Sequence, residues 1–138
     1  MKLFICDDNQ QFAEKLKSDI LSINADCEVT LFSTISSLLF MLEDKGSRID
    51  GIFLDIKNTD GNGIDAAMKI KAKYPLIRLV LVTGYGDEYS QDIFNCSAEY
   101  RPVAFLLKPV KEKYLRIALE KISDTTIKNE RYIQIAYN

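Results

Sequence analysis

The most informative segment of the sequence is Gly51-Ile52-Phe53-Leu54-Asp55, an apolar run that ends in a carboxylate. A short run that is apolar throughout, rather than alternating, is typical of a parallel strand with helices on both faces. Four other segments are predicted to be strands as well, so that the five strands are residues 3–6, 28–32, 51–54, 77–82 and 103–107.

The segments between these strands carry apolar residues at helical spacing, which predicts amphipathic helices. The predicted helices are residues 9–23, 33–43, 64–74, about 88–95 and 111–122. Asp60-Gly61-Asn62-Gly63 predicts a turn before the third of them. This alternation favours an α/β protein with a flavodoxin-like (βα)5 fold, a doubly wound parallel sheet with the strand order 2-1-3-4-5.

The end of the chain does not fit this pattern. The length of 138 residues suits one domain, and residues 1–123 would complete it. Residues 124–138 would be a polar connector followed by a strand, since Ile133, Ile135 and Tyr137 alternate with smaller or polar residues. This strand has no obvious partner in a five-stranded sheet. It would be either the start of a truncated second domain or a pendant edge strand or frayed tail.

Composition excludes several classes of function. With 18 basic and 20 acidic side chains the net charge is -2, which argues against a nucleic-acid surface. The chain has no histidine, so Ser-His-Asp and Cys-His hydrolases, His-ligated metals and a phosphohistidine within this chain are excluded. Cys6, Cys27 and Cys96 are too far apart for a zinc site and odd in number, which argues against a disulfide framework. No run is long enough to span a membrane and no signal peptide is evident, so we expect a cytoplasmic protein.

Polar residues follow four of the predicted strands. Asp7 and Asp8 follow the first strand, Asp55 the third, Thr83 the fourth and Lys108 the fifth. Carboxyl ends of parallel strands meet at one edge of a sheet, so these groups should converge. Oxygen ligands of this kind suit Mg²⁺, and a metal, an ammonium and a hydroxyl together suit a phosphoryl group. A carboxylate can then act as the nucleophile and form an aspartyl phosphate.

Each of these residues also has a plainer interpretation. Asp7 and Asp8 could cap the following helix, and Asp55 could form a turn. Thr83 could be a loop hydroxyl and Lys108 a solvated lysine before Pro109. The combination on one sheet edge favours the phosphoryl-transfer interpretation.

Together these residues resemble the receiver (CheY-like) domain of two-component response regulators, from about residue 1 to residue 123. The matching motifs, in chain order, are Phe4-Ile5-Cys6-Asp7-Asp8, Phe53-Leu54-Asp55-Ile56, Gly63-Ile64-Asp65, Val82-Thr83-Gly84-Tyr85 and Phe105-Leu106-Leu107-Lys108-Pro109. Two strand ends look most similar to receivers of LytTR-type transcriptional regulators. The tail strand resembles the beginning of their DNA-binding output domain.

The resemblance implies a role for each site residue. Asp55 would be the phosphoacceptor, and Mg²⁺ would be bound by Asp55, by Asp8 directly, by Asp7 largely through water and by the backbone carbonyl of Lys57. The family likeness further implies that the phosphoryl group is bound by Lys108 and Thr83. Phe105 would be the aromatic switch residue that turns inward when Thr83 moves.

The resemblance also implies a switch rather than an enzyme. A sensor histidine kinase would be the phosphodonor, which agrees with the absence of histidine in this chain. Phosphorylation would change the face made by the fourth helix, the fifth strand and the fifth helix, and would favour a homodimer. DNA would be contacted only through an output domain, and a membrane not at all.

Other functions stay open. A stand-alone phosphorelay protein or a pseudo-receiver that only binds partners would share this sequence pattern. A phosphatase with an aspartate nucleophile normally has a second aspartate two residues after the first, where this chain has Lys57. A flavodoxin would need a phosphate loop after the first strand, and Asp7-Asp8-Asn9 is not one.

The chain departs from the receiver pattern beside the acceptor. Asn58 and Thr59 stand where methionine and proline are usual, which leaves the loop less restricted and places a polar group where a packed one is expected. Lys57 would be a solvated surface lysine or, if it points inward, a cation beside the phosphoryl group. The segment 85–102 is longer than typical.

Overall fold

A parallel sheet forms the centre of the molecule. The computed structural model describes residues 1–45, 48–84, 102–124 and 134–136. Its main sheet has the strand order β2-β1-β3-β6-β7-β8, and every pair is parallel. The strands are β1 (Lys2–Cys6), β2 (Glu28–Phe32), β3 (Gly51–Asp55), β6 (Arg78–Thr83), β7 (Ala104–Leu107) and β8 (Gln134–Ala136). The first five strands along the sheet confirm the predicted flavodoxin-like order 2-1-3-4-5, with β6 and β7 as the fourth and fifth.

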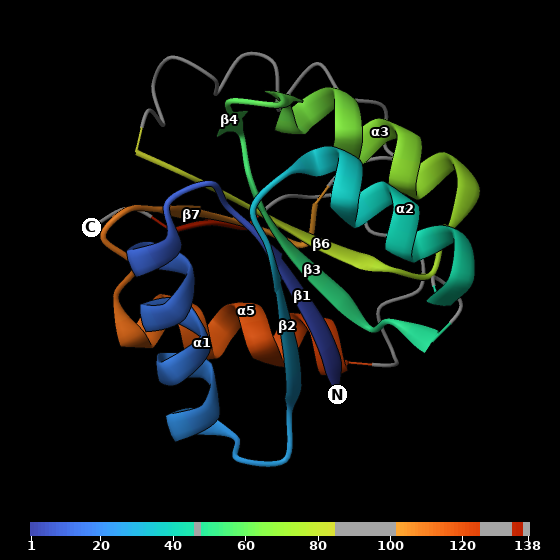
Figure 1. Ribbon diagram of the computed structural model, residues 1–138. Coiled ribbons are helices and arrows are strands. Elements are labelled where there is room, and N and C mark those ends of the chain that lie inside the picture. The colour runs from blue at the N-terminus through green and yellow to red at the C-terminus, as the bar shows by residue number, and fades with distance from the viewer. Residues whose placement is uncertain (46–47, 85–101, 125–133, 137–138) are drawn as a thin grey trace.

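Helices cover both faces of this sheet. Figure 1 shows α1 (Gln10–Ile23) and α5 (Glu112–Ser123) on one face and α2 (Ile35–Lys45) and α3 (Gly63–Lys73) on the other. The bounds of these helices differ from the predicted ones by at most two residues. The predicted helix near 88–95 lies outside the described residues.

Side-chain caps explain where α1 and α2 begin. Asn9 Oδ1 accepts a hydrogen bond from the backbone N–H of Phe12 (3.1 Å), which makes Asn9 the N-cap of α1 rather than its first residue. Thr34 Oγ1 accepts from the N–H of Ser37 (3.1 Å), and α2 accordingly begins at Ile35 and not at Ser33. A polar side chain that satisfies a free N–H therefore belongs outside the helix that it starts.

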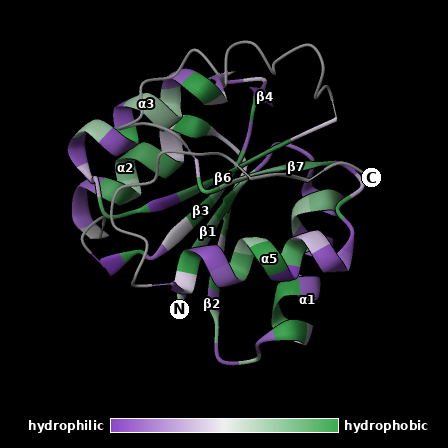
Figure 2. Cartoon of the chain, turned by 180° about the vertical axis from the view of Figure 1, so that it is seen from behind, coloured by the Kyte–Doolittle hydropathy of each residue, from purple (hydrophilic) through white to green (hydrophobic). Residues whose placement is uncertain are grey.

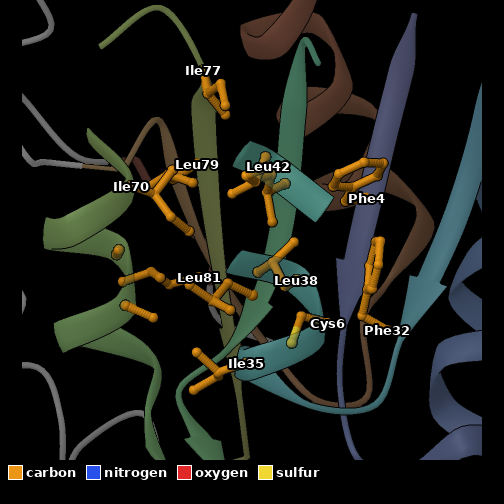
Figure 3. Packing of buried hydrophobic residues seen from close by; sticks show 14 of the residues in the cluster. Phe4, Cys6, Phe32, Ile35, Leu38, Leu42, Ile70, Ile77, Leu79 and Leu81 are labelled. Atoms are coloured by element: carbon orange, nitrogen blue, oxygen red, sulfur yellow. The ribbon is translucent and has the colours of Figure 1, made fainter. Parts of the chain in front are cut away.

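Two apolar layers hold the sheet and helices together. Alternate residues along β1 point to opposite faces, so Phe4 and Cys6 pack under α2 and α3 while Leu3 and Ile5 pack under α1 and α5. Figure 3 shows the first layer, in which side chains from α2 and α3 meet those of the strands. In Figure 2 the strands carry mostly hydrophobic colours, whereas each helix carries both. Burial on both faces explains why the strand sequences are apolar rather than alternating.

The turn predicted at 58–63 is a small hairpin. Strands β4 (Lys57–Asn58) and β5 (Gly61–Asn62) pair in antiparallel register, and Gly61 has a φ of 149°. A side chain at Gly63 would collide with the carbonyl oxygen of Asp55 and lie 2.7 Å from the Cα of Ile56. Glycines thus allow the chain to turn back tightly against the end of β3.

The tail strand has a partner in the main sheet. β8 pairs with the outer edge of β7 in parallel register, with Phe105 opposite Ile135. This position agrees with the edge-strand alternative of the prediction, because the outer edge of β7 offers backbone groups with which another strand can pair. The division of the chain at residues 123 and 124 stays a prediction.

The described helices include no segment with both the length and the apolar character needed to cross a membrane.

Candidate functional site

Four strand ends bring the predicted site residues to one edge of the sheet. Residues Cys6 and Leu54 pair in register, as do Asp55 and Val82, and the next step pairs Thr83 with Leu107. The groups that follow these positions therefore lie together at the carboxyl edge, on the side of the sheet where β4 lies (Figure 1).

Three carboxylates form the centre of this edge. One oxygen atom from each of Asp7, Asp8 and Asp55 lies within 4.8 Å of the other two. Asp7 is 3% exposed and Asp55 5% exposed, whereas Asp8 is exposed. Buried like charges at this spacing repel one another unless a cation lies among them.

Lys108 supplies one such cation. Its Nζ lies 2.7 Å from Asp7 Oδ2 and 3.7 Å from Asp55 Oδ1, and its side chain is 24% exposed. The backbone N–H of Lys108 donates to the carbonyl of Thr83 (2.9 Å), which joins the ends of β6 and β7. One ammonium therefore compensates two buried carboxylates only in part.

Burial and charge act together on Asp55. Its pKa is raised from 3.8 to about 6, first by burial and second by the negative charge of Asp7. The ammonium of Lys108 and a hydrogen bond from the backbone N–H of Lys57 oppose this rise. At pH 7 Asp55 is therefore mainly ionised, as a nucleophile must be, but at an energetic cost that a further cation would relieve.

Cys6 lies behind this group of charges without belonging to it. Its thiol is fully buried, and burial, followed by the charge of Asp7, raises its pKa to about 12. Cys6 is therefore a neutral side chain of the core.

The carboxylates fit a magnesium ion. Asp7 Oδ1 accepts a hydrogen bond from the N–H of Asn9 (2.8 Å), and the buried Asp7 Oδ2 has the Lys108 ammonium as its partner at 2.7 Å. Asp8 Oδ2 accepts from the N–H of Thr59 (2.9 Å), which fixes the direction of the exposed carboxylate. Carboxylate oxygens are the ligands that a hard divalent cation prefers, and three carboxylates beside one ammonium keep a net negative charge that such a cation would compensate. The carbonyl of Lys57 as a further ligand stays a prediction.

A cavity of about 580 Å³ opens in front of these groups. Its lining residues are Asp8, Asn9, Asp55, Lys57, Asn58, Thr59, Gly84 and Lys108. Lys57 is exposed at this cavity, as expected of a surface lysine, and lies close enough to the opening to meet an anion that enters. The carboxylates of Asp8 and Asp55 and the side chains of Lys57 and Lys108 thus face one space.

Thr83 and Phe105 lie deeper than the other predicted site residues. Both are fully buried, and Phe105 packs in the core layer beneath α2 and α3. Phe105 belongs to β7 and Thr83 ends the neighbouring strand β6. The ring of Phe105 is therefore in an inward position in this structure.

The sequence analysis missed a role for Asn58 and Asp60. Asn58 is buried, donates through Nδ2 to the carbonyl of Ser33 (3.2 Å) and accepts from the N–H of Asp60 (2.9 Å). Asp60 Oδ2 in turn accepts from the N–H and the hydroxyl of Ser36 (both 2.7 Å). These hydrogen bonds lower the pKa of Asp60. The loop that we expected to be less restricted is thus anchored to the start of α2, and only the Asx-turn character of Asn58 could have hinted at it.

Phe12 is a third residue with a contact that the sequence did not indicate. It lies on the apolar face of α1 and packs against the core. Its ring also lies under the ammonium of Lys108, with 4.3 Å between Nζ and the ring centroid. No sequence signal indicates this contact, because Phe12 and Lys108 are brought together only by the fold.

Known proteins resemble this chain in sequence and in fold. A family model for the response regulator receiver domain matches residues 3–120. Similar proteins include "Hybrid signal transduction histidine kinase L" of Dictyostelium discoideum, 25% identical over 124 residues, and "Sensory transduction protein LytT" of Enterococcus faecalis, 29% identical over 124 residues. These matches cover 87% and 89% of this chain but 7% and 48% of the two relatives, so the chain spans less than half of either.

Solved structures share the fold. A response regulator receiver domain protein from Clostridium thermocellum has a TM-score of 0.76 and 26% identity, over 88% of this chain and 92% of that one. A two-component response regulator from Clostridium difficile has a TM-score of 0.77 over 93% of this chain and 99% of that one. Its identity is 21%, so this second likeness concerns the fold alone.

Proposed function

The chain belongs to the response regulator receiver domain family, and from this we propose that it is a signalling switch in which Asp55 accepts a phosphoryl group from a partner histidine kinase. The observation that carries the proposal is the position of Asp55. Its carboxylate is buried among two further carboxylates, lies 3.7 Å from the Lys108 ammonium and lines the cavity.

The chemistry that this arrangement supports is an in-line transfer. A carboxylate oxygen of Asp55 forms a bond to phosphorus as the bond from phosphorus to the kinase histidine breaks, and the histidine leaves. Lys108 stays protonated and compensates the negative charge that Asp55 gains. Mg²⁺ bound by Asp7, Asp8, Asp55 and the carbonyl of Lys57 would supply further positive charge for the phosphoryl oxygens. Thr83 would donate a hydrogen bond to the same oxygens.

The response to phosphorylation involves the strand that carries Lys108. We infer that Thr83 moves toward the phosphoryl group and that Phe105, whose ring is already buried, occupies the space behind it. The surface that includes β7 and α5 then changes and favours a homodimer. Movement of this surface would transmit the effect of phosphorylation at Asp55 to an output domain.

The output that we propose is control of transcription in the cytoplasm. The similarity to LytT supports an output domain of the LytTR type, joined through residues 124–138. DNA would be contacted through that domain and not through the receiver, whose net charge is not basic.

A switch is favoured over a phosphatase with the same nucleophile. The residue two positions after Asp55 is Lys57, which cannot act as the carboxylic acid that turnover would need. After removal of the phosphodonor, we expect the phosphorylated protein to decay slowly, without steady production of inorganic phosphate.

Intact-mass measurement tests the acceptor. Acetyl phosphate with Mg²⁺ should add one phosphoryl group to the protein, and Asp55→Asn should abolish this addition. Asp65→Asn is the matched control, because Asp65 is an exposed carboxylate in the first turn of α3. A phosphoryl group that survives in Asp55→Asn would show that the assignment is wrong.

A further inference from the structure

The ammonium of Lys108 has contacts on three sides. Asp7 Oδ2 lies at 2.7 Å, Asp55 Oδ1 at 3.7 Å and the centroid of the Phe12 ring at 4.3 Å. The two carboxylates are expected partners of a lysine at this edge. The aromatic ring is a third partner, and a cation over a ring face is attracted to it.

The backbone fixes the ring relative to the carboxylates. Asp7 Oδ1 accepts from the N–H of Asn9, and Asn9 Oδ1 accepts from the N–H of Phe12 (2.8 and 3.1 Å). The carbonyl of Asn9 also accepts from the N–H of Ala13 (3.0 Å). The first turn of α1, which carries Phe12, is therefore linked through Asn9 to the carboxylate that the ammonium contacts.

Lysine needs such a support more than most side chains do. Its four-carbon stem has many rotamers, and holding it in one of them costs conformational entropy. A ring on one side removes part of this freedom and excludes water from that side of Nζ. The ammonium is then held within reach of Asp55 before a phosphoryl group arrives.

We propose that Phe12 is a positioning residue for phosphoryl transfer, whose ring holds the Lys108 ammonium beside Asp55. This inference rests on the proposed phosphorylation of Asp55 and deepens it. The transfer itself is unchanged: the bond to phosphorus forms at Asp55, the donor group leaves, and Lys108 neither gives nor takes a proton.

Packing alone is the alternative role for Phe12, since the ring also packs against the apolar layer under α1 and α5. The two roles differ in what can replace the ring. Leucine can fill much of the apolar space but offers no π face, whereas tyrosine keeps the face. Phe12→Leu and Phe12→Tyr therefore form a matched pair of variants.

The first measurement uses the protein without metal or phosphodonor. A methylene group next to an ammonium that lies over a ring should have its NMR signal shifted upfield by the ring current. We expect this shift for the Lys108 Cε protons in the wild type and in Phe12→Tyr, and its loss in Phe12→Leu. The signal is assigned from its absence in Lys108→Arg. An ordinary lysine shift in the wild type, or one unchanged in Phe12→Leu, overturns the inference.

The second measurement is the rate of labelling by acetyl phosphate with Mg²⁺. We expect Phe12→Leu to be slower by roughly fivefold, which corresponds to the strength of one partly exposed cation–π contact. Phe12→Tyr should keep the wild-type rate. In a Lys108→Ala background, Phe12→Leu should have no further effect, because the ring would have no ammonium to hold.

The outcomes separate this inference from the proposed function. A wild type that is labelled on Asp55, with Phe12→Leu labelled equally fast, overturns the role of Phe12 alone. Equal slowing by Phe12→Leu with and without Lys108 also overturns it, because it would indicate a packing role. A wild type that is not labelled at all overturns the proposed function, and the positioning role with it.

Discussion

The amino edge and the carboxyl edge of the sheet, where the strands begin and end, differ in how their charged groups are paired. At the amino edge, Lys71 Nζ donates to the carbonyls of Pro75 (2.9 Å) and Ile77 (2.7 Å), and Arg78 Nη1 donates to those of Lys121 (3.2 Å) and Asp124 (2.9 Å). At the carboxyl edge, three carboxylates share one nearby ammonium, which lies 2.7 Å from Asp7 Oδ2 and 3.7 Å from Asp55 Oδ1. Satisfied cations tie loops together at one edge, whereas the other edge keeps an unbalanced negative charge.

This difference indicates that the amino edge stabilises the fold and that the carboxyl edge destabilises it. Buried polar groups stabilise a fold only when their partners are present, and an unbalanced set costs stability. A cationic ligand bound at the carboxyl edge would restore the stability that the unbalanced carboxylates cost. The contrast can be tested by substitutions and a ligand, in order of decreasing expected effect.

The largest effect should come from the satisfied edge. Lys71→Met would leave the carbonyls of Pro75 and Ile77 without their donor, and we expect a loss of about 3 kcal/mol in the free energy of unfolding. Urea denaturation measures this loss. Lys69→Met, an exposed position on the same helix, should change stability by less than about 0.5 kcal/mol. Equal effects of the two substitutions would contradict the structural role of Lys71.

The second largest effect should be an increase in stability, caused by a substitution at the carboxyl edge. Asp55→Asn removes a buried charge, so without metal at pH 7.5 we expect the free energy of unfolding to rise by on the order of 2 kcal/mol. The matched control is Asp65→Asn, which should change little at this exposed position. A destabilised Asp55→Asn would show that the carboxylates are balanced after all.

The same substitution gives a pH dependence whose sign can be worked out. The pKa of Asp55 is about 6 in the folded protein against an ordinary 3.8, so the folded state holds this proton more tightly between these values. The contribution of Asp55 to stability therefore falls as pH rises through that window. The advantage of Asp55→Asn over the wild type should accordingly be large at pH 7.5 and small near pH 4.5. An advantage that is constant with pH would exclude this origin.

The smallest effect is the gain from metal. Mg²⁺ at about ten times its dissociation constant should raise the free energy of unfolding by about 1.4 kcal/mol, because it binds the folded carboxylates and not the unfolded chain. Thermal denaturation with and without millimolar Mg²⁺ measures this gain. Asp8→Asn should weaken it, and Lys69→Met should leave it intact. A wild type that shows no shift would contradict the metal site.

The sequence predicted the groups at the carboxyl edge, but it did not predict the contacts at the amino edge. The strand order and the meeting of Asp7, Asp8, Asp55 and Lys108 follow from apolar periodicity and from the rule that parallel strands end at one edge. Lys71 gave no such signal. Its partners are backbone carbonyls, which every residue carries, so only the path of the chain decides which of them it meets.

The loop beside the acceptor shows the same limit. The turn signal of residues 60–63 was correct, but the absence of a proline suggested a looser loop than the one that forms. Asn58 and Asp60 compensate through hydrogen bonds to Ser33 and Ser36, residues that lie some 24 positions earlier in the chain. Contacts of this range depend on how α2 packs against the sheet, which local propensity does not specify.

The amino-acid sequence of this chain therefore specifies the class of fold, the strand order and the set of groups at the carboxyl edge, because these depend on periodicity and on the handedness of strand connections. Three-dimensional packing specifies the burial, the pKa and the neighbours of these groups. It raises the pKa of Asp55 through burial, brings the Phe12 ring under Lys108 and pairs β8 with β7. Burial, distance and an unpaired strand edge are properties of the assembled sheet, and they arise only when segments far apart in the chain come together.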